Sequence, residues 1–315
     1  MHKRGIKYSG IIIQTNHSHS LEALKLSILN SSNRAKRVAF QGEHGAYSEE
    51  AVIEHFGETV EPVPCESFDN VFEKVQEGNC DYGMIPIENS LAGSIHRNYD
   101  LLLQFPLSVV GEQYLRISHC LIGMPGTSLE RIKKVISHPQ ALAQCERFLA
   151  SLKGVDIEPV YDTAGGVKMV KNMGNEAIAA IASHRAAQIY EMAILAKEIE
   201  DNPANFTRFQ VIARESVSPG NDAKTSIVFS LNNRPGELYR AMSVFALRNI
   251  DLTKIESRPL IGKPWEYFFY IDFVGSIEDP ITQRALSNLQ EFSTFMRILG
   301  SYPRHQPRVQ RKEAE

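Results

Sequence analysis

Short apolar segments alternate with longer amphipathic segments between residues 37 and 214, and polar turns separate them. The apolar segments 37–41, 82–87 and 134–136 each run into small polar residues and then into a stretch with helical spacing. In the stretch 68–77, apolar residues recur every three or four positions, as they do on one face of a helix. Repeated strand–loop–helix units predict an α/β fold with mainly parallel sheets.

A second pattern begins at about Lys224. The residues before it, 216–223, are polar and rich in turn-forming types, which is typical of a domain boundary. Up to about residue 303, segments then follow in the order strand, helix, strand, strand, helix, strand. This is the order of the ferredoxin-like fold, so we expect a second, smaller domain there.

Length and charge narrow the possible functions. A chain of 315 residues with a net charge of −3 is long enough for two domains and gives no indication of a nucleic-acid or membrane partner. No apolar run reaches the roughly 18 residues needed to span a bilayer. The four cysteines form no CxxC pair and the ten histidines no HExxH motif, so we expect no metal site and a reducing compartment.

The first 36 residues differ from the rest of the chain. They are rich in Ser, Asn and basic residues, and Glu22 is their only acid. The apolar run 11–13 is too short for the hydrophobic region of a secretory signal. Two interpretations stay open. One is a disordered extension of a cytoplasmic protein, or a start codon assigned too early, and the other is the transit peptide of a plastid protein.

Small polar residues stand at four junctions where a predicted strand runs into a predicted helix. They are Ser48, Asn89 with Ser90, Ser137 and Thr163. Such residues often cap helix N-termini, and helix N-termini bind anions. Ligands of open α/β sheets bind outside the carboxyl ends of the strands. The four junctions together predict a pocket for a small, oxygen-rich anion, although each one taken singly is also explained as a helix cap.

The segment 205–209 places one hydroxyl and one guanidinium between two aromatic rings. The Thr207 hydroxyl can hydrogen-bond a leaving oxygen, and Arg208 can grip a carboxylate through two parallel N–H bonds. Phe206 and Phe209 would exclude water and strengthen both interactions. The alternative is a plain strand with an aromatic face and one surface arginine.

Several common catalytic motifs are absent. The sequence contains no GxGxxG, no GxxxxGK[ST] and no GxSxG. Glu88 is an acid in the candidate loop that contains Asn89 and Ser90, where we expect it to orient the loop rather than bind an anion. The sequence therefore predicts a site that holds an anion and donates hydrogen bonds, with no cofactor.

Over about residues 37–303 the chain resembles prephenate dehydratases and the related arogenate dehydratases. Six motifs in order carry the resemblance: Gly42 to Ser48, Pro86 to Ser94, Ser137 to Cys145, Asp162 to Gly165, Asn205 to Phe209, and Glu256 to Pro259. The resemblance implies two α/β lobes with the active site between them, as in periplasmic solute-binding proteins. It implies conversion of prephenate to phenylpyruvate, and residues 93–100 resemble the plant-type branch, in which arogenate can be the substrate.

The resemblance also implies roles for single residues. Thr207 is the implied essential hydroxyl. The expected catalytic residues are Thr207, Asn89, Ser137, Gln144 and Arg208, and the expected substrate-binding residues are Ser48, Ser90, Thr163 and Phe209. The expected division of the chain is an extension (1–36), a catalytic domain (37–215), a linker (216–223), a regulatory domain (224–303) and a tail (304–315).

The C-terminal part resembles an ACT domain, a module that binds amino acids where two copies pair. This resemblance implies L-phenylalanine as an allosteric inhibitor and assembly into a homodimer or homotetramer. The expected effector-binding residues are Asn233, Gly236, Leu238, Glu256, Ser257 and Arg258. A domain that serves dimerisation alone is the alternative.

Two other functions stay open. One is arogenate dehydratase, the same chemistry on an amino acid. The other is a non-enzymatic amino-acid sensor, against which the segment 207–209 and the lack of a DNA-binding pattern count. We expect no fused chorismate mutase domain, because the residues before the first predicted strand are too few to form one.

Overall fold

The computed structural model describes residues 34–260, 262–263 and 265–306. It divides into one unit of residues 1–35 and a second of residues 36–315. Almost all of the predicted N-terminal extension, and most of the predicted tail, lie outside the described residues. Within those described ranges, no helix is both long and apolar enough to cross a membrane.

The first lobe is built on a sheet with the strand order β2-β1-β3-β11-β5, and β4 pairs with β3. Its strands are β1 (Arg37–Gln41), β2 (Glu61–Cys65), β3 (Tyr82–Asn89), β4 (Gly93–Ser94), β5 (Ser108–Arg116) and β11 (Phe206–Ala213). Its helices are α2 (Tyr47–Phe56), α3 (Phe68–Gln76) and α4 (His96–Gln104). Apolar side chains of β1, β3 and β11 are fully buried between these helices, which fixes the sheet.

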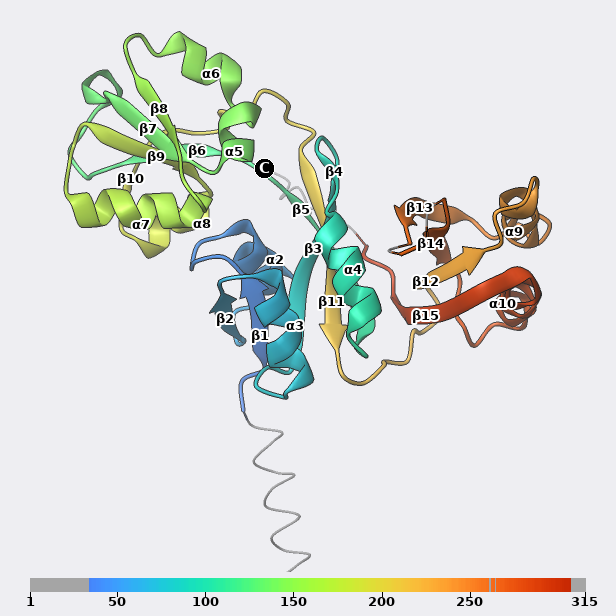
Figure 1. Ribbon diagram of the computed structural model, residues 1–315. Helices are drawn as coiled ribbons and strands as arrows, with labels where there is room; N and C mark the ends of the chain where they lie inside the picture. The colour runs from blue at the N-terminus through green and yellow to red at the C-terminus, as the bar shows by residue number, and fades with distance from the viewer. Residues whose placement is uncertain (1–33, 261, 264, 307–315) are drawn as a thin grey trace, which may run out of the picture. The chain divides into compact units, whose positions relative to one another are not determined.

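The second lobe has a sheet with the order β10-β6-β9-β7-β8. Its strands are β6 (Cys120–Gly123), β7 (Lys134–Ser137), β8 (Asp156–Pro159), β9 (Ile178–Ala182) and β10 (Ala193–Ala196). Its helices are η1 (Leu129–Arg131), α5 (Pro139–Gln144), α6 (Glu146–Ser151), α7 (Thr163–Met173) and α8 (His184–Ile189). Figure 1 shows α5 and α6 on one side of this sheet and α7 and α8 on the other. Helices α5 and α6 pack on an apolar cluster of the second lobe, whereas the cluster under α7 and α8 also includes residues of the first lobe.

The prediction of an α/β fold with two lobes is confirmed, but the prediction of mainly parallel sheets is wrong. Strand β1 pairs in parallel with β2 and β3, and β7 pairs in parallel with β8 and β9. The pairs that involve β4, β5, β6, β10 and β11 are antiparallel. The reason is the path of the chain, which leaves the first lobe after β5 and returns to it through β11.

The C-terminal sheet has the order β13-β14-β12-β15, and all its pairs are antiparallel. Its elements are β12 (Ala223–Leu231), α9 (Glu237–Ala246), β13 (Leu252–Pro259), β14 (Tyr267–Val274), α10 (Pro280–Phe292) and β15 (Ser293–Pro303). This confirms the predicted ferredoxin-like order. Helices α9 and α10 cover one face of the sheet, where their apolar residues meet those of β12 and β14.

The other face of the C-terminal sheet packs on the first lobe. Val228, Tyr270 and Tyr302 belong to one buried cluster together with Val109 of β5. Strand β15 passes so close to β5 that a Cβ atom at Gly300 would clash with the carbonyl oxygen of Val109. The absence of a side chain at Gly300 therefore permits this approach.

Candidate active site

A cavity of about 510 Å³ is lined by residues of both lobes and of the connecting segment that follows β5. Six of the residues predicted from the sequence line it: Ser48, Asn89, Gln144, Thr163, Thr207 and Phe209. The connecting segment contributes His119, and the second lobe contributes His138 and Asp162. Within the described ranges, no three His, Cys, Asp or Glu side chains are grouped to bind a metal ion.

The orientation of the Thr207 hydroxyl follows from the Asn89 side chain. The Asn89 Oδ1 atom accepts backbone N–H bonds from Leu91 at 3.0 Å and Ala92 at 2.9 Å. The amide nitrogen of Asn89 must therefore point the other way, where it donates to Thr207 Oγ1 at 3.0 Å. Because Thr207 accepts this bond, its own proton is free for an acceptor in the cavity.

A chain of hydrogen bonds extends from Asn89 along the cavity wall. Asn89 Nδ2 also donates to Asn205 Oδ1 at 2.8 Å, and Asn205 Nδ2 donates to Gln144 Oε1 at 3.0 Å. The same Gln144 oxygen lies 2.9 Å from His119 Nε2. That oxygen accepts both bonds, so the His119 proton is on Nε2.

The far end of this chain is Tyr47. Its hydroxyl lies 2.7 Å from His119 Nδ1 and 2.8 Å from the carbonyl oxygen of Ser118. Burial lowers the pKa of His119 and raises the pKa of Tyr47 well above its ordinary value, so both side chains are neutral. With its proton on Nε2, His119 presents Nδ1 as an acceptor, so the single hydroxyl proton of Tyr47 is shared between Nδ1 and the carbonyl oxygen of Ser118. The sequence patterns did not identify Tyr47 or His119, because no spacing rule joins them to the segment 205–209.

Three of the predicted site residues are absent from the cavity lining. The Ser137 hydroxyl is buried and donates to the carbonyl oxygen of Ile181 at 2.6 Å. The Ser90 hydroxyl donates to the carbonyl oxygen of Ala204 at 2.9 Å and accepts from the Phe206 amide at 2.9 Å. Both serines thus tie backbone segments together, and the third residue absent from the lining is Arg208.

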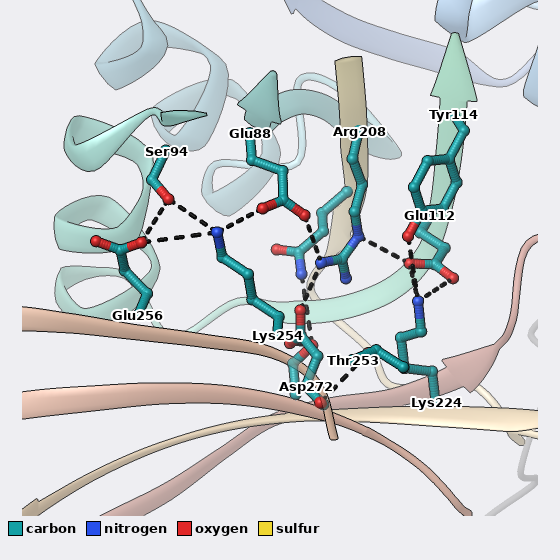
Figure 2. A network of polar contacts seen from close by, with 12 residues as sticks. Glu88, Ser94, Glu112, Tyr114, Arg208, Lys224, Thr253, Lys254, Glu256 and Asp272 are labelled. Atoms are coloured by element: carbon teal, nitrogen blue, oxygen red, sulfur yellow. Dashed lines mark hydrogen bonds and ion pairs between the residues drawn. The ribbon is translucent and has the colours of Figure 1, made fainter. Parts of the chain in front are cut away.

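The structure places Arg208 on the face of β11 opposite to Thr207, because successive side chains of a strand point to opposite faces. The guanidinium is only 2% exposed and lies 2.9 Å from Glu112 Oε2 and 2.6 Å from Asp272 Oδ2. It also donates to the Tyr302 hydroxyl at 3.3 Å. Figure 2 shows it directed toward the C-terminal sheet. This placement disagrees with the predicted grip of Arg208 on a substrate carboxylate.

The prediction that small polar residues cap the helices is also wrong. Ser48 and Thr163 lie inside the first turns of α2 and α7. The cap of α7 is Asp162, which accepts from the Gly165 amide at 3.0 Å, and the cap of α5 is His138, which accepts from the Gln140 amide. Helix α2 starts two residues earlier than the pattern suggested and α7 starts one residue earlier, so the hydroxyls of Ser48 and Thr163 remain at the cavity.

The predicted effector residues fall into two groups. Asn233, Gly236 and Leu238 surround the start of α9 and are exposed. Glu256 and Arg258 instead point toward the first lobe, where Glu256 accepts from Ser94 at 2.5 Å and Arg258 pairs with Asp100 at 2.9 Å. Ser257 lies between them on the opposite, exposed face of β13.

Comparisons with known proteins show which family the chain is similar to. Residues 38–217 match the family model described as prephenate dehydratase. The chain is 50% identical over 295 residues to arogenate dehydratase/prephenate dehydratase 2, chloroplastic, of Arabidopsis thaliana, with 90% of this chain and 76% of the relative covered.

Two solved structures are also similar. One is a prephenate dehydratase from Arthrobacter aurescens in complex with L-Phe, with a TM-score of 0.78, 32% identity, and coverage of 85% of this chain and 90% of that one. The other is described as a novel type of quorum quenching acylase, with a TM-score of 0.79, 35% identity, and coverage of 86% and 98%.

Proposed function

This chain belongs to the prephenate dehydratase family, and we propose that it converts prephenate to phenylpyruvate in the biosynthesis of L-phenylalanine. The observation that carries the proposal is the orientation of Thr207, which accepts a hydrogen bond from Asn89 and keeps its own proton for the cavity. The reaction needs a donor at a leaving hydroxyl. It transfers no electrons to a second molecule, so we propose no cofactor.

The proposed chemistry breaks two bonds of the substrate ring. The bond to the ring carboxylate breaks, carbon dioxide leaves, and the electron pair enters the ring. The carbon–oxygen bond at the opposite ring carbon breaks, and its pair leaves with the hydroxyl, which takes up a proton and departs as water. Negative charge develops on that oxygen, so a preorganised donor such as Thr207 lowers the barrier. The ring becomes aromatic, which drives the reaction.

The substrate's carboxylates need groups that hold anions. Ser48 and Thr163 line the cavity at the first turns of α2 and α7, where free backbone N–H groups and the helix dipole favour negative charge. We assign the two helix starts to these carboxylates. Holding the ring between the lobes supplies the orientation that lets both bonds break together.

The proposal is tested by incubating the purified protein with prephenate and measuring phenylpyruvate by mass spectrometry. We expect phenylpyruvate to form at a rate proportional to the protein concentration. The catalytic proposal is refuted if neither prephenate nor arogenate yields product. Calorimetric binding of an amino acid without turnover would then favour the sensor.

Arogenate dehydratase is the alternative within the same chemistry. It is supported by the relative that carries both activities in its name. Arogenate has an amino acid side chain where prephenate has a keto acid, while the ring that reacts is the same. Side-by-side values of kcat/KM separate the two, because a preference for arogenate of tenfold or more would make L-phenylalanine the direct product.

We further propose that L-phenylalanine binds the C-terminal domain and inhibits turnover. We also propose that the protein assembles into a homodimer or homotetramer. The proposal is supported by the relative solved with L-Phe and by two exposed apolar side chains, Tyr239 of α9 and Leu247 at the C-cap of this helix, at 78% and 81% exposure. Calorimetry tests the binding, and sedimentation analysis tests the assembly. If titration with L-phenylalanine releases or absorbs no heat, the proposed binding is refuted. If the protein is a monomer at all concentrations, the proposed assembly is refuted.

The location of the protein has two candidates. We propose the cytoplasm on the basis of the sequence, with a plastid as the alternative that the chloroplastic relative supports. Imaging of the full chain fused at its C-terminus to a fluorescent protein distinguishes them.

Acylase activity is a second candidate function, favoured by the similarity to the structure described as an acylase. The cavity geometry supports it less well, because His119 is engaged at both ring nitrogens. His138 Nδ1 accepts from the Gln140 amide. Incubation with an N-acyl substrate and detection of the released amine would test it.

A further inference from the structure

Strands β3 and β11 form an antiparallel pair whose two faces carry different chemistry. In the register of this pair, Thr207 is opposite Asn89 and Arg208 is opposite Glu88. Thr207 and Asn89 are joined by a hydrogen bond on the cavity face. On the other face, Arg208 Nη1 lies 3.4 Å from Glu88 Oε1. The two pairs are consecutive residues of the same backbones, so they cannot move independently.

The pair on the second face is held by residues of the C-terminal sheet (Figure 2). Asp272 of β14 accepts from Arg208 at 2.6 Å. Lys254 of β13 forms an ion pair with Glu88 and donates to Ser94 of β4 at 2.9 Å. Each of the two residues next to the catalytic pair is thus anchored by an opposite charge from the other domain.

The buried charges of this contact are paired across the two domains. The first lobe supplies the Arg208 cation and the anions Glu88 and Glu112, and Glu112 is completely buried. The C-terminal sheet supplies the cations Lys224 and Lys254 and the anions Asp272 and Glu256. Lys224 lies 2.8 Å from Glu112. A buried charge that loses its partner is strongly unfavourable. The alignment of β3 with β11 therefore depends on the docked C-terminal sheet.

We propose that Glu88 and Arg208 are positioning residues through which the C-terminal sheet aligns the Thr207 hydroxyl and the Asn89 amide. This inference rests on the proposed catalytic role of Thr207. Lys254 and Asp272 are absent from the cavity lining, so their removal changes kcat rather than KM. Small displacements of a catalytic group have large effects on rate, so we expect kcat to fall between about tenfold and hundredfold.

The test uses Lys254→Met in the full-length protein, because Lys254 is far less buried than Arg208. With the substrate that the wild type turns over, we expect the stated loss in kcat, KM within twofold, and an unfolding temperature close to that of the control. Lys254→Arg, which keeps the charge, should restore most of the rate. If Lys254→Met does not fold, Lys254→Met with Glu88→Gln removes the pair without an unpaired charge, and the same loss in kcat is expected.

Arg297→Met is the matched control. Arg297 of β15 is another cation that crosses the same boundary, and it donates to the carbonyl oxygens of Leu103, Phe105 and Leu107 at 2.9–3.2 Å. These acceptors are not next to Thr207 or Asn89, so kcat should stay within twofold of the wild type.

The outcomes separate the two proposals when Thr207→Ala is measured in the same assay. Suppose that Thr207→Ala loses turnover while folded Lys254→Met and folded Arg297→Met have the same kcat. This result would overturn the inference about Glu88 and Arg208 and leave the catalytic proposal standing. Retained turnover in Thr207→Ala would overturn the catalytic proposal and the inference with it. A loss in Lys254→Met that appears only in KM would also overturn the inference.

Discussion

The hydrogen bond from Asn89 to Thr207 leads to a specific prediction for Asn89→Asp, which replaces the amide nitrogen by oxygen and preserves the shape. One carboxylate oxygen can still accept from the amides of Leu91 and Ala92, as Oδ1 does now. The other oxygen has no proton to donate, so it accepts from Thr207 instead. The Thr207 proton then points away from the cavity.

The magnitude follows from the loss of one preorganised donor at the leaving oxygen. Removing such a donor lowers kcat by about 10²–10³, or about 2.7–4 kcal/mol of transition-state stabilisation. The bond at 3.0 Å between Asn89 and Thr207 contributes only about 1 kcal/mol to folding by itself. We therefore expect a large effect on kcat and a small effect on stability.

Steady-state kinetics with Asn89→Asp, Thr207→Val and the double variant check this reasoning. If Asn89 acts through Thr207, the double variant should be no slower than the slower single variant. Circular dichroism and an unfolding curve confirm that each variant is folded. The reasoning is refuted if Asn89→Asp keeps kcat within threefold of the wild type, or if the losses of the two single variants multiply in the double variant.

Two further predictions concern stability. Gly300→Ala should lower the free energy of unfolding by about 1–3 kcal/mol, because the added methyl group meets the Val109 carbonyl. Urea titration measures this change, and an unchanged unfolding midpoint would contradict the close approach of β15 to β5. Burial, followed by the nearby Glu54 carboxylate, raises the pKa of Glu50 to about 7 from an ordinary 4.5. The folded state then binds this proton more tightly than the unfolded state, so stability falls as the pH rises from about 4.5 through 7. Glu50→Gln should therefore raise the free energy of unfolding by roughly 1–3 kcal/mol at pH 8 and change it little at pH 4, and an equal effect at both would contradict the assignment.

The sequence contained a signal for the placement of Arg208. Strand β11 begins at Phe206, earlier than the apolar run 211–213 suggests, and so it includes both Thr207 and Arg208. Neighbouring residues of one strand cannot both point into the same cavity. Treating the segment 205–209 as strand from its start would have assigned the hydroxyl and the guanidinium to opposite faces.

Other features of the site could not be read from the sequence. Asp272 and Glu112 contact Arg208 across 64 and 96 residues of chain, and no local pattern pairs them. His119 and Tyr47 are 72 residues apart and meet only because the connecting segment after β5 returns to α2. Local periodicity predicted the elements well, whereas the polar contacts depend on how the lobes and the C-terminal sheet pack.

The most direct test of the account is the turnover of Thr207→Val, in which a methyl group replaces the hydroxyl at nearly constant volume. Initial rates with prephenate and with arogenate should give a kcat about 10²–10³ lower than the wild type, with KM within threefold and an unchanged unfolding temperature. A folded Thr207→Val protein with kcat within fivefold of the wild type would contradict the assignment of Thr207 as the donor to the leaving hydroxyl.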